Sequence, residues 1–179
     1  MSPALLELVL SSTLETLYMV AVAGLISAAL GIPLGVALYT SRPGQILARP
    51  ALNSVLSIIT NVGRSVPFII LMVAIIPLTR LIAGSSIGTN AAIVPLTIAS
   101  IPFVARLIEG ALNEVGPGLV EAAQAMGATP MQIITKVLLP EARGGIINGL
   151  TITVVTLISY SAMAGTVGGG GLGDLGIRY

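Results

Sequence analysis

An uncharged stretch from Thr16 to Thr40 constrains this chain more than any other feature. A helix over that stretch, rising 1.5 Å per residue, is long enough to cross the ~30 Å hydrocarbon layer of a bilayer. The composition agrees, because 55% of the 179 residues are hydrophobic and only 8% are charged, whereas soluble domains carry about a quarter charged residues. A secretory signal peptide is a poor match, since no Lys or Arg precedes the stretch and the stretch is too long. We therefore expect an all-α integral membrane protein that contacts lipid along much of its length.

Three further apolar segments are predicted to cross the bilayer, at Val66 to Thr79, about Ile87 to Ala105 and about Gly145 to Val167. Arg64 and Arg80 bracket the first of these segments. A helix between the two arginines would separate them by about 24 Å, so one lies near each membrane face. The sequence thus predicts a bundle of four spans.

Two Gly-x-x-x-Gly pairs lie within the predicted spans, one at Gly31 and Gly35 and the other at Gly145 and Gly149. Membrane helices pack closely where small residues line up on one face. Both pairs therefore predict sites of close contact between helices.

Several chemistries are excluded by residue types that the chain lacks. It has no Cys and no His, which rules out disulfides, thiol nucleophiles, Ser-His-Asp triads and the usual zinc ligand sets. The single lysine, Lys136, lies in no phosphate-binding Gly-x-x-x-x-Gly-Lys motif, so any ATP must bind to another subunit. A net charge of +1 argues against nucleic acid as a partner. We expect neither an enzyme nor a bound cofactor or metal in this chain.

A Gly-x-Gly-x-x-Gly pattern runs from Gly171 to Gly176 and matches the dinucleotide-binding fingerprint. That fingerprint requires a preceding strand in a soluble βαβ unit, and here a membrane span precedes it. We interpret these residues as a flexible external loop.

The distribution of basic residues predicts the orientation in the membrane. Positively charged loops are retained in the cytoplasm. The larger basic set is Arg42, Arg49, Arg106, Lys136 and Arg143, and the smaller set is Arg80 and Arg178. The segment 1–15 is therefore expected outside the cell, and the charged loop 106–143 is expected in the cytoplasm.

This loop has a helical pattern of its own. Residues 119–126 are expected to form a short helix that Gly127 ends, followed by a capping box of Thr129 and Gln132 that starts a second helix. The apolar residues of the first helix are predicted to share one face, namely Leu119, Val120, Ala123 and Met126. An interfacial helix on lipid usually carries several basic residues. The only charged residue between positions 115 and 130 is the acid Glu121. The pattern therefore favours docking into a groove on a partner protein.

The motif Glu121-Ala122-Ala123, followed by Gly127 and by Leu139-Pro140, resembles the EAA loop of ABC importer permeases. The resemblance implies a helical bundle of the type I ABC importer permease kind. It also implies that this loop forms a coupling helix, with Glu121, Ala122, Ala123, Met126 and Gly127 as the residues that meet an ATP-hydrolysing subunit. Family members of this kind have five spans, so the permease domain 16–179 is expected to be incomplete at its C-terminal end.

Other segments are similar to the methionine-specific branch of that family, namely residues 64–68, 91–97, 121–132 and 160–163. This similarity implies a permease that moves L- or D-methionine into the cytoplasm across a bacterial inner membrane. The implied partners are a cytoplasmic P-loop ATPase that binds the ATP, an external substrate-binding protein or lipoprotein, and a second copy of the chain. Two alternatives stay open, a permease for another amino acid or small solute, and a secondary transporter or channel. The second alternative would need acids within the spans, and none is predicted there past Glu15.

Three residues are candidates for the translocation path. Tyr160 and Met163 lie three positions apart on one helical face, where they either pack against a neighbouring helix or line the path. A flexible, polarizable Met suits a constriction that opens for a thioether-bearing solute. Arg64 either extends to the membrane surface or pairs with Glu109 or Glu114 near an inner gate.

Overall fold

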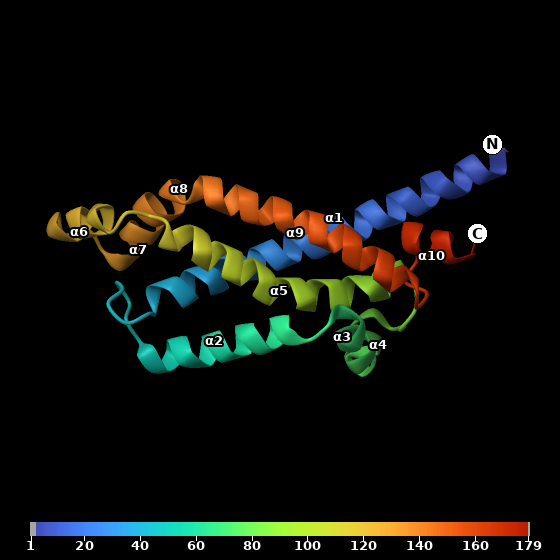
Figure 1. Ribbon diagram of the computed structural model, residues 1–179, viewed down its shortest axis with the longest axis horizontal. Coiled ribbons are helices and arrows are strands. Elements are labelled where there is room, and N and C mark those ends of the chain that lie inside the picture. The colour runs from blue at the N-terminus through green and yellow to red at the C-terminus, as the bar shows by residue number, and fades with distance from the viewer. Residues whose placement is uncertain (1–2, 179) are drawn as a thin grey trace. The chain divides into compact units, whose positions relative to one another are not determined.

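The structure is a computed structural model that describes residues 3–178, and every regular element in that range is a helix (Figure 1). Three helices are long and apolar enough to cross a membrane. They are α1 (Pro3–Thr40), α5 (Thr89–Asn113) and α9 (Arg143–Gly165). These helices confirm three of the four predicted spans.

The second predicted span is not one continuous helix from Arg64 to Arg80. The segment folds instead as α2 (Pro50–Ser65), α3 (Phe68–Ala74) and α4 (Ile76–Ala83). The axes of α2 and α3 meet at 101°, so the two helices count as a fourth span only if they form one broken span. Pro67 lies at this bend, where proline lacks an amide donor and disfavours helical geometry in the residue before it.

The loop between α5 and α9 contains further helical elements. These are α6 (Pro117–Ala125), α7 (Pro130–Ile133), a π-helix η1 (Ile134–Leu138) and α8 (Leu139–Glu141). Helix α5 continues to Asn113, beyond the predicted loop start at Arg106. Gly144 and Gly145 both lie within α9.

The glycine-rich segment after α9 is not the predicted loop. Residues Gly171–Arg178 form helix α10. The carboxylate of Glu15 accepts a hydrogen bond from the amide of Gly171 at 2.7 Å, and the hydroxyl of Thr16 accepts one from the amide of Leu172 at 2.9 Å. The first amide groups of a helix have no hydrogen-bond acceptor within the helix. In α10 these two side chains, from α1, provide the acceptors.

The chain divides into two compact units. Unit 1 comprises residues 3–27, 65–100 and 153–178, and unit 2 comprises residues 28–64 and 101–152. The helices α1, α5 and α9 each contribute one part to each unit. The core of unit 1 includes the buried side chains of Met19, Leu96 and Leu157.

In unit 2, both Gly-x-x-x-Gly pairs lie against α5. A Cβ atom on Gly35 would lie 2.6 Å from Ile108 Cβ, and one on Gly145 would lie 2.7 Å from Ala111 Cβ. Real Cβ atoms almost never approach that closely, so only glycine permits these helix contacts. The predicted role of the two pairs is therefore confirmed.

Candidate coupling site and buried charge cluster

Helix α6 has sharp boundaries that its sequence explains. Pro117 occupies its first turn, where the missing amide donor costs nothing. Its C-terminal end is set by Gly127, whose φ of 78° is a left-handed conformation that favours glycine. The amide of Ala128 then donates to the carbonyl of Ala123 at 3.0 Å and closes the turn.

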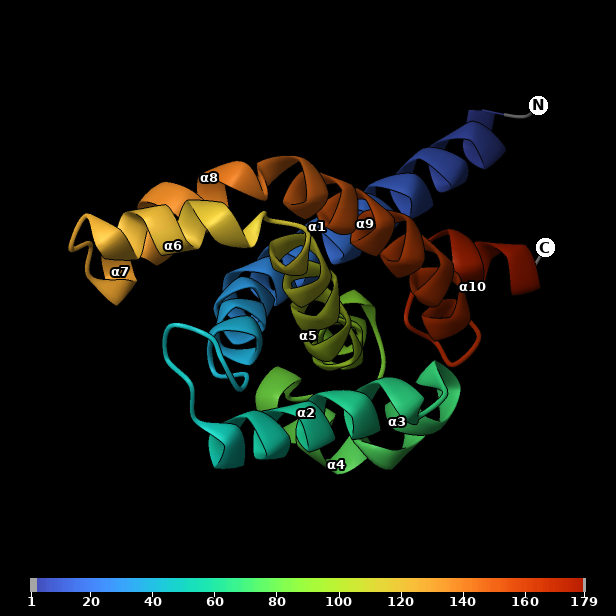
Figure 2. The same cartoon turned by 60° about the vertical axis from the view of Figure 1, so that its left-hand side comes forward.

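The chain reverses after α6 and begins α7 with the predicted capping box. The hydroxyl of Thr129 accepts from the amide of Gln132, and the side chain of Gln132 accepts from the amide of Thr129 at 2.9 Å. Helix α6 then packs against α7 and η1. Both views show α6 beside α7 (Figures 1 and 2). The resulting hairpin buries Val120, Ala123, Ile133 and Leu138 in an apolar core that it shares with α5.

The predicted apolar face of α6 is divided in the structure. Val120 and Ala123 are buried in the hairpin core, whereas Leu119 and Met126 are exposed, Met126 to 82%. The prediction of one shared face was wrong because the hairpin core needs only the two positions that face α7 and η1. Leu119 and Met126 are thereby left free for another surface.

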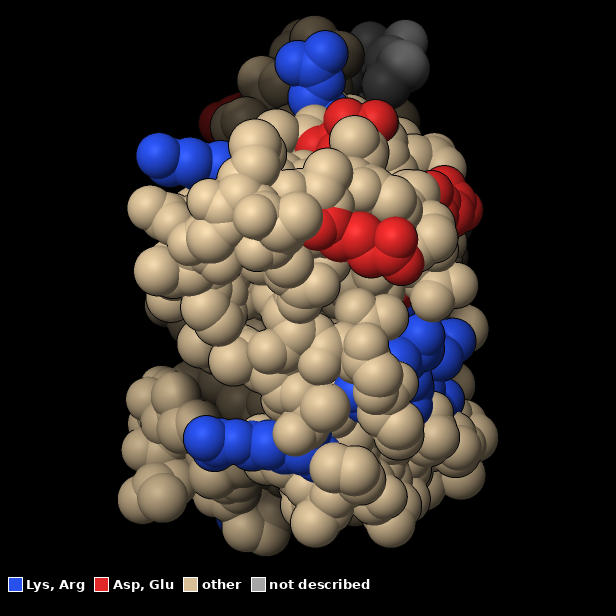
Figure 3. Space-filling view, turned by 90° about the vertical axis from the view of Figure 1, so that its left-hand side faces the viewer, with Lys and Arg blue, Asp and Glu red and all other residues tan. Residues whose placement is uncertain are grey.

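The two alanines of the EAA motif have different environments. Ala123 is buried against the hairpin core, while Ala122 and the preceding Glu121 are exposed. Figure 3 views unit 2 from the end that carries α6 and α7, and shows a mostly uncharged surface with separate acidic and basic groups. The exposed side of α6 therefore combines a single acid with small and apolar side chains.

A buried charge cluster, composed of Arg42, Arg106 and Glu109, lies elsewhere in unit 2. Glu109 on α5 is only 2% exposed. Its Oε1 atom lies 2.5 Å from Nη2 of Arg42, and its Oε2 atom lies 2.5 Å from Nη1 of Arg106. A buried carboxylate is tolerable only when it is paired in this way.

The two arginines of the cluster extend it to other elements. Arg106 Nη2 donates to Asn61 Oδ1 at 2.9 Å and to the carbonyl of Ser57 at 3.3 Å, both on α2. Arg42 Nη1 donates to Asn113 Oδ1 at 3.1 Å, at the last residue of α5. The cluster thus joins α2, α5 and the loop that follows α1.

The sequence analysis missed this cluster because it assigned Arg106 and Glu109 to an aqueous loop. In the structure both residues continue an apolar helix, and their i,i+3 spacing places them on one face. An Arg and a Glu at i,i+3 spacing directly after an uncharged apolar run can therefore predict an ion pair at the end of a membrane span.

Glu109 is not the partner of Arg64. The guanidinium carbon of Arg64 lies 5.9 Å from the centre of the Phe103 ring, in a cation–π arrangement, and Glu109 pairs with Arg42 and Arg106 instead. Arg64 itself is exposed.

The two other path candidates lie on α9 in unit 1. Tyr160 is half-buried, and its ring stacks on Phe68 with centroids 4.5 Å apart and planes within 4° of parallel. Met163 is 40% exposed. The structure brings Tyr160 together with Phe68, a contact that the spacing within α9 did not predict.

These features define a helical membrane protein with a helical hairpin between two of its spans. The family described as "Binding-protein-dependent transport system inner membrane component" matches residues 31–178. The chain belongs to this family. Its fold is that of the type I ABC permeases, as the comparison with solved structures also shows.

Individual relatives are similar along most of the chain. The probable D-methionine transport system permease protein MetI of Vibrio cholerae is 67% identical over 97% of this chain and 77% of its own length. The D-methionine transport system permease protein MetI of Escherichia coli K12 is 54% identical over 92% of this chain and 76% of its own length. A solved structure of inward-facing conformations of the MetNI methionine ABC transporter matches with a TM-score of 0.98 and 54% identity, over 100% of this chain and 83% of the solved chain.

Proposed function

We propose that this chain is the membrane permease subunit of an ATP-driven importer that moves methionine into the cytoplasm. The observation that carries the proposal is the 67% identity to a D-methionine permease over 97% of the chain. The helical hairpin with the EAA motif supports the same conclusion, because a permease without an ATP site needs a surface that receives motion from an ATPase. The chain itself is not catalytic, and ATP binds to the partner subunit.

The exposed side of α6 supports a docking role toward a P-loop ATPase in the cytoplasm. Leu119 and Met126 offer apolar contacts, and Ala122 lets the backbone approach closely. Glu121, as the single acid between residues 115 and 130, would meet a basic group on the rim of the partner's cleft. Gly127 sets the turn that presents this surface.

The other partners follow from the same family resemblance. A second copy of the chain would complete the translocation path, and an external binding protein or lipoprotein would deliver the amino acid. The N-terminal segment lies outside in this proposal, and the loop 106–143 lies in the cytoplasm of a bacterial inner-membrane protein. Tyr160, Met163 and Arg64 are proposed to line or flank the path.

A secondary transporter is less well supported. Such proteins use buried acids to carry protons or bind ions. The buried acid Glu109 is instead paired with Arg42 and Arg106, whose positive charges compensate its negative charge.

The proposal is tested by ATP-driven uptake of methionine into vesicles that contain this chain, an ATPase subunit and a binding protein. Glu121→Lys should insert normally but reduce uptake at least about tenfold, because the reversed charge opposes docking. Glu114→Lys, which changes an exposed acid outside α6, is the matched control and should leave uptake within about twofold. Absence of methionine uptake by the unaltered complex would contradict the proposed function.

A further inference from the structure

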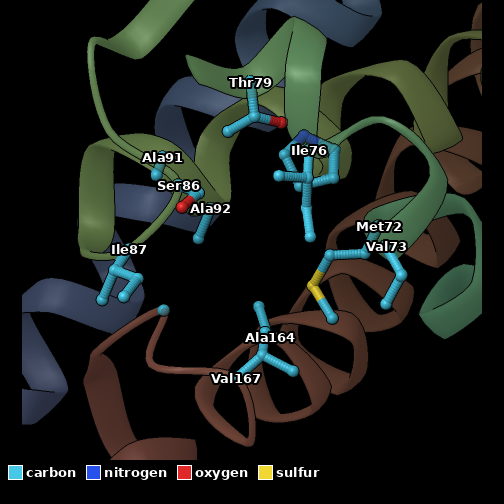
Figure 4. Close-up of a pocket in the computed structure, with 12 residues that line it drawn as sticks. Met72, Val73, Ile76, Thr79, Ser86, Ile87, Ala91, Ala92, Ala164 and Val167 are labelled. Atoms are coloured by element: carbon cyan, nitrogen blue, oxygen red, sulfur yellow. The ribbon is translucent and has the colours of Figure 1, made fainter.

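A cavity of about 140 Å³ lies within unit 1. Its walls come from α3, α4, the start of α5 and the end of α9. Figure 4 shows the side chains of Met72, Ile76 and Ala164 converging on the same opening from three of these elements. None of the elements on its walls belongs to the coupling hairpin, so the cavity is a feature separate from the docking surface described above.

The lining of the cavity is suited to an uncharged, flexible group. No charged side chain lines it, and the only side-chain hydroxyls on its wall are those of Thr79 and Ser86. An apolar cavity of about 150 Å³ in a protein can hold a molecule the size of benzene. The volume here therefore matches one side chain of about four to six non-hydrogen atoms. Met72 on the wall adds a polarizable sulfur that adapts to the shape of such a chain.

A cation lies beside this apolar space. Nε of Arg80 donates to Oγ of Ser86 at 3.2 Å, and Ser86 is one of the lining residues. Arg80 is exposed and forms no ion pair within residues 3–178. A guanidinium group binds carboxylates through parallel hydrogen bonds. An apolar space beside a guanidinium that has no carboxylate partner among the described residues is complementary to an α-amino acid with an uncharged apolar side chain.

The cavity also adjoins the residues that are proposed to line the path. Met72, Ala92 and Ala164 line the cavity and belong to the same buried cluster as Phe68, against which Tyr160 packs. The cavity wall and the Phe68–Tyr160 stack are therefore parts of one apolar cluster.

We propose that this cavity is a subsite of the permease for the apolar side chain of the transported amino acid, and that Arg80 binds its carboxylate. This inference rests on the proposed function and adds to it a place where the permease itself recognises its substrate. An unbranched chain of methionine length fills the space, whereas glycine leaves it empty and a large aromatic chain exceeds it.

The chain has no native Cys, so a single introduced thiol reports on the cavity. Ser86→Cys places a thiol on the wall, and Ser85→Cys places one on the adjacent exposed residue as the matched control. Both variants are assembled with the ATPase and binding protein in vesicles, and the rate of alkylation by a small maleimide is measured. Methionine should slow alkylation at position 86 at least about fivefold and leave position 85 unchanged, and glycine should affect neither position.

The part played by Arg80 is tested with methioninol, which keeps the side chain and lacks the carboxylate. Methioninol should protect position 86 much less than methionine does. In Arg80→Gln the difference between the two compounds should disappear. Equal protection by both compounds in the unaltered Arg80 background would overturn the role of Arg80.

Uptake of methionine is measured in the same vesicles, which separates this inference from the proposed function. Normal uptake without protection at position 86 overturns the subsite and leaves the importer intact. Protection that depends on lipid or detergent composition but not on methionine also overturns the subsite, because the cavity then holds an acyl chain. Protection without uptake in any assembled complex would overturn the importer and leave an amino-acid site.

Discussion

Arg42 and Glu109 form a direct ion pair, with Nη2 and Oε1 2.5 Å apart, although one residue follows α1 and the other lies near the end of α5. Arg106 binds the second oxygen of the same carboxylate. Glu109 is therefore the common point at which α2, α5 and the loop after α1 are held together. The cluster thus holds the end of α5 close to the point where the chain enters the hairpin of α6 and α7.

Glu109→Gln is expected to destabilise the protein by about 1–3 kcal/mol. Breaking a fully buried ion pair costs about 3–5 kcal/mol, and the smaller figure reflects the Arg42 side chain, which is 36% exposed and partly hydrated. The measurement is thermal unfolding in detergent. Glu114→Gln, at an exposed acid on the same segment, is the control and should change the unfolding temperature little. Equal effects from both substitutions would show that the cluster has no special structural role.

Gly35→Ala is expected to weaken the contact between α1 and α5 by about 1–3 kcal/mol, because the new Cβ would lie 2.6 Å from Ile108 Cβ. Gly110→Ala on α5 is the matched control, since nothing lies within 4 Å of the added atom. That control should be neutral or stabilising by up to ~1 kcal/mol through helix propensity. Unfolding temperatures of the two variants, measured side by side, check the prediction. It fails if Gly35→Ala is as stable as Gly110→Ala.

Tyr160→Ala is expected to reduce methionine uptake more than tenfold, whereas Tyr160→Phe should stay within about twofold. The phenylalanine keeps the stack on Phe68, a type of contact worth about 0.5–1.5 kcal/mol beyond its buried area, and the alanine removes it. Tyr18→Ala, which removes an exposed ring on α1, serves as the control. If uptake by Tyr160→Ala equals uptake by Tyr18→Ala, neither Tyr160 nor its stack on Phe68 contributes to transport.

The orientation can be checked by single cysteines at two exposed positions, Asn90→Cys and Gln124→Cys. The distribution of basic residues predicts that position 90 lies outside and position 124 in the cytoplasm. A membrane-impermeant maleimide added to intact cells should label position 90 and not position 124, while both are labelled after the membrane is opened. The opposite pattern in intact cells would invert the proposed topology.

Local features of the coupling hairpin were predictable because they depend on a few neighbouring residues. The left-handed turn at Gly127 and the capping box of Thr129 and Gln132 follow from backbone geometry within one turn. Three of the spans were predictable for a similar reason, since an uncharged apolar run of sufficient length has few stable alternatives to a membrane helix. The close contact between α1 and α5 at Gly35 was also predicted, from the spacing of Gly31 and Gly35.

Only the tertiary structure decided which of these elements meet. The burial of Ala123 beside the exposed Met126 depends on packing against other elements. The pairing of Glu109 with Arg42 depends on a group distant in the chain. From the sequence, Glu109 was assigned to a solvent-exposed loop. Its carboxylate is buried here because two arginines from separate elements compensate for its lost hydration. Sequence by itself thus determined the membrane class, most spans and the local hairpin geometry. The packing of distant segments decided the ion-pair partners, which residues of the hairpin are exposed, and the cavity.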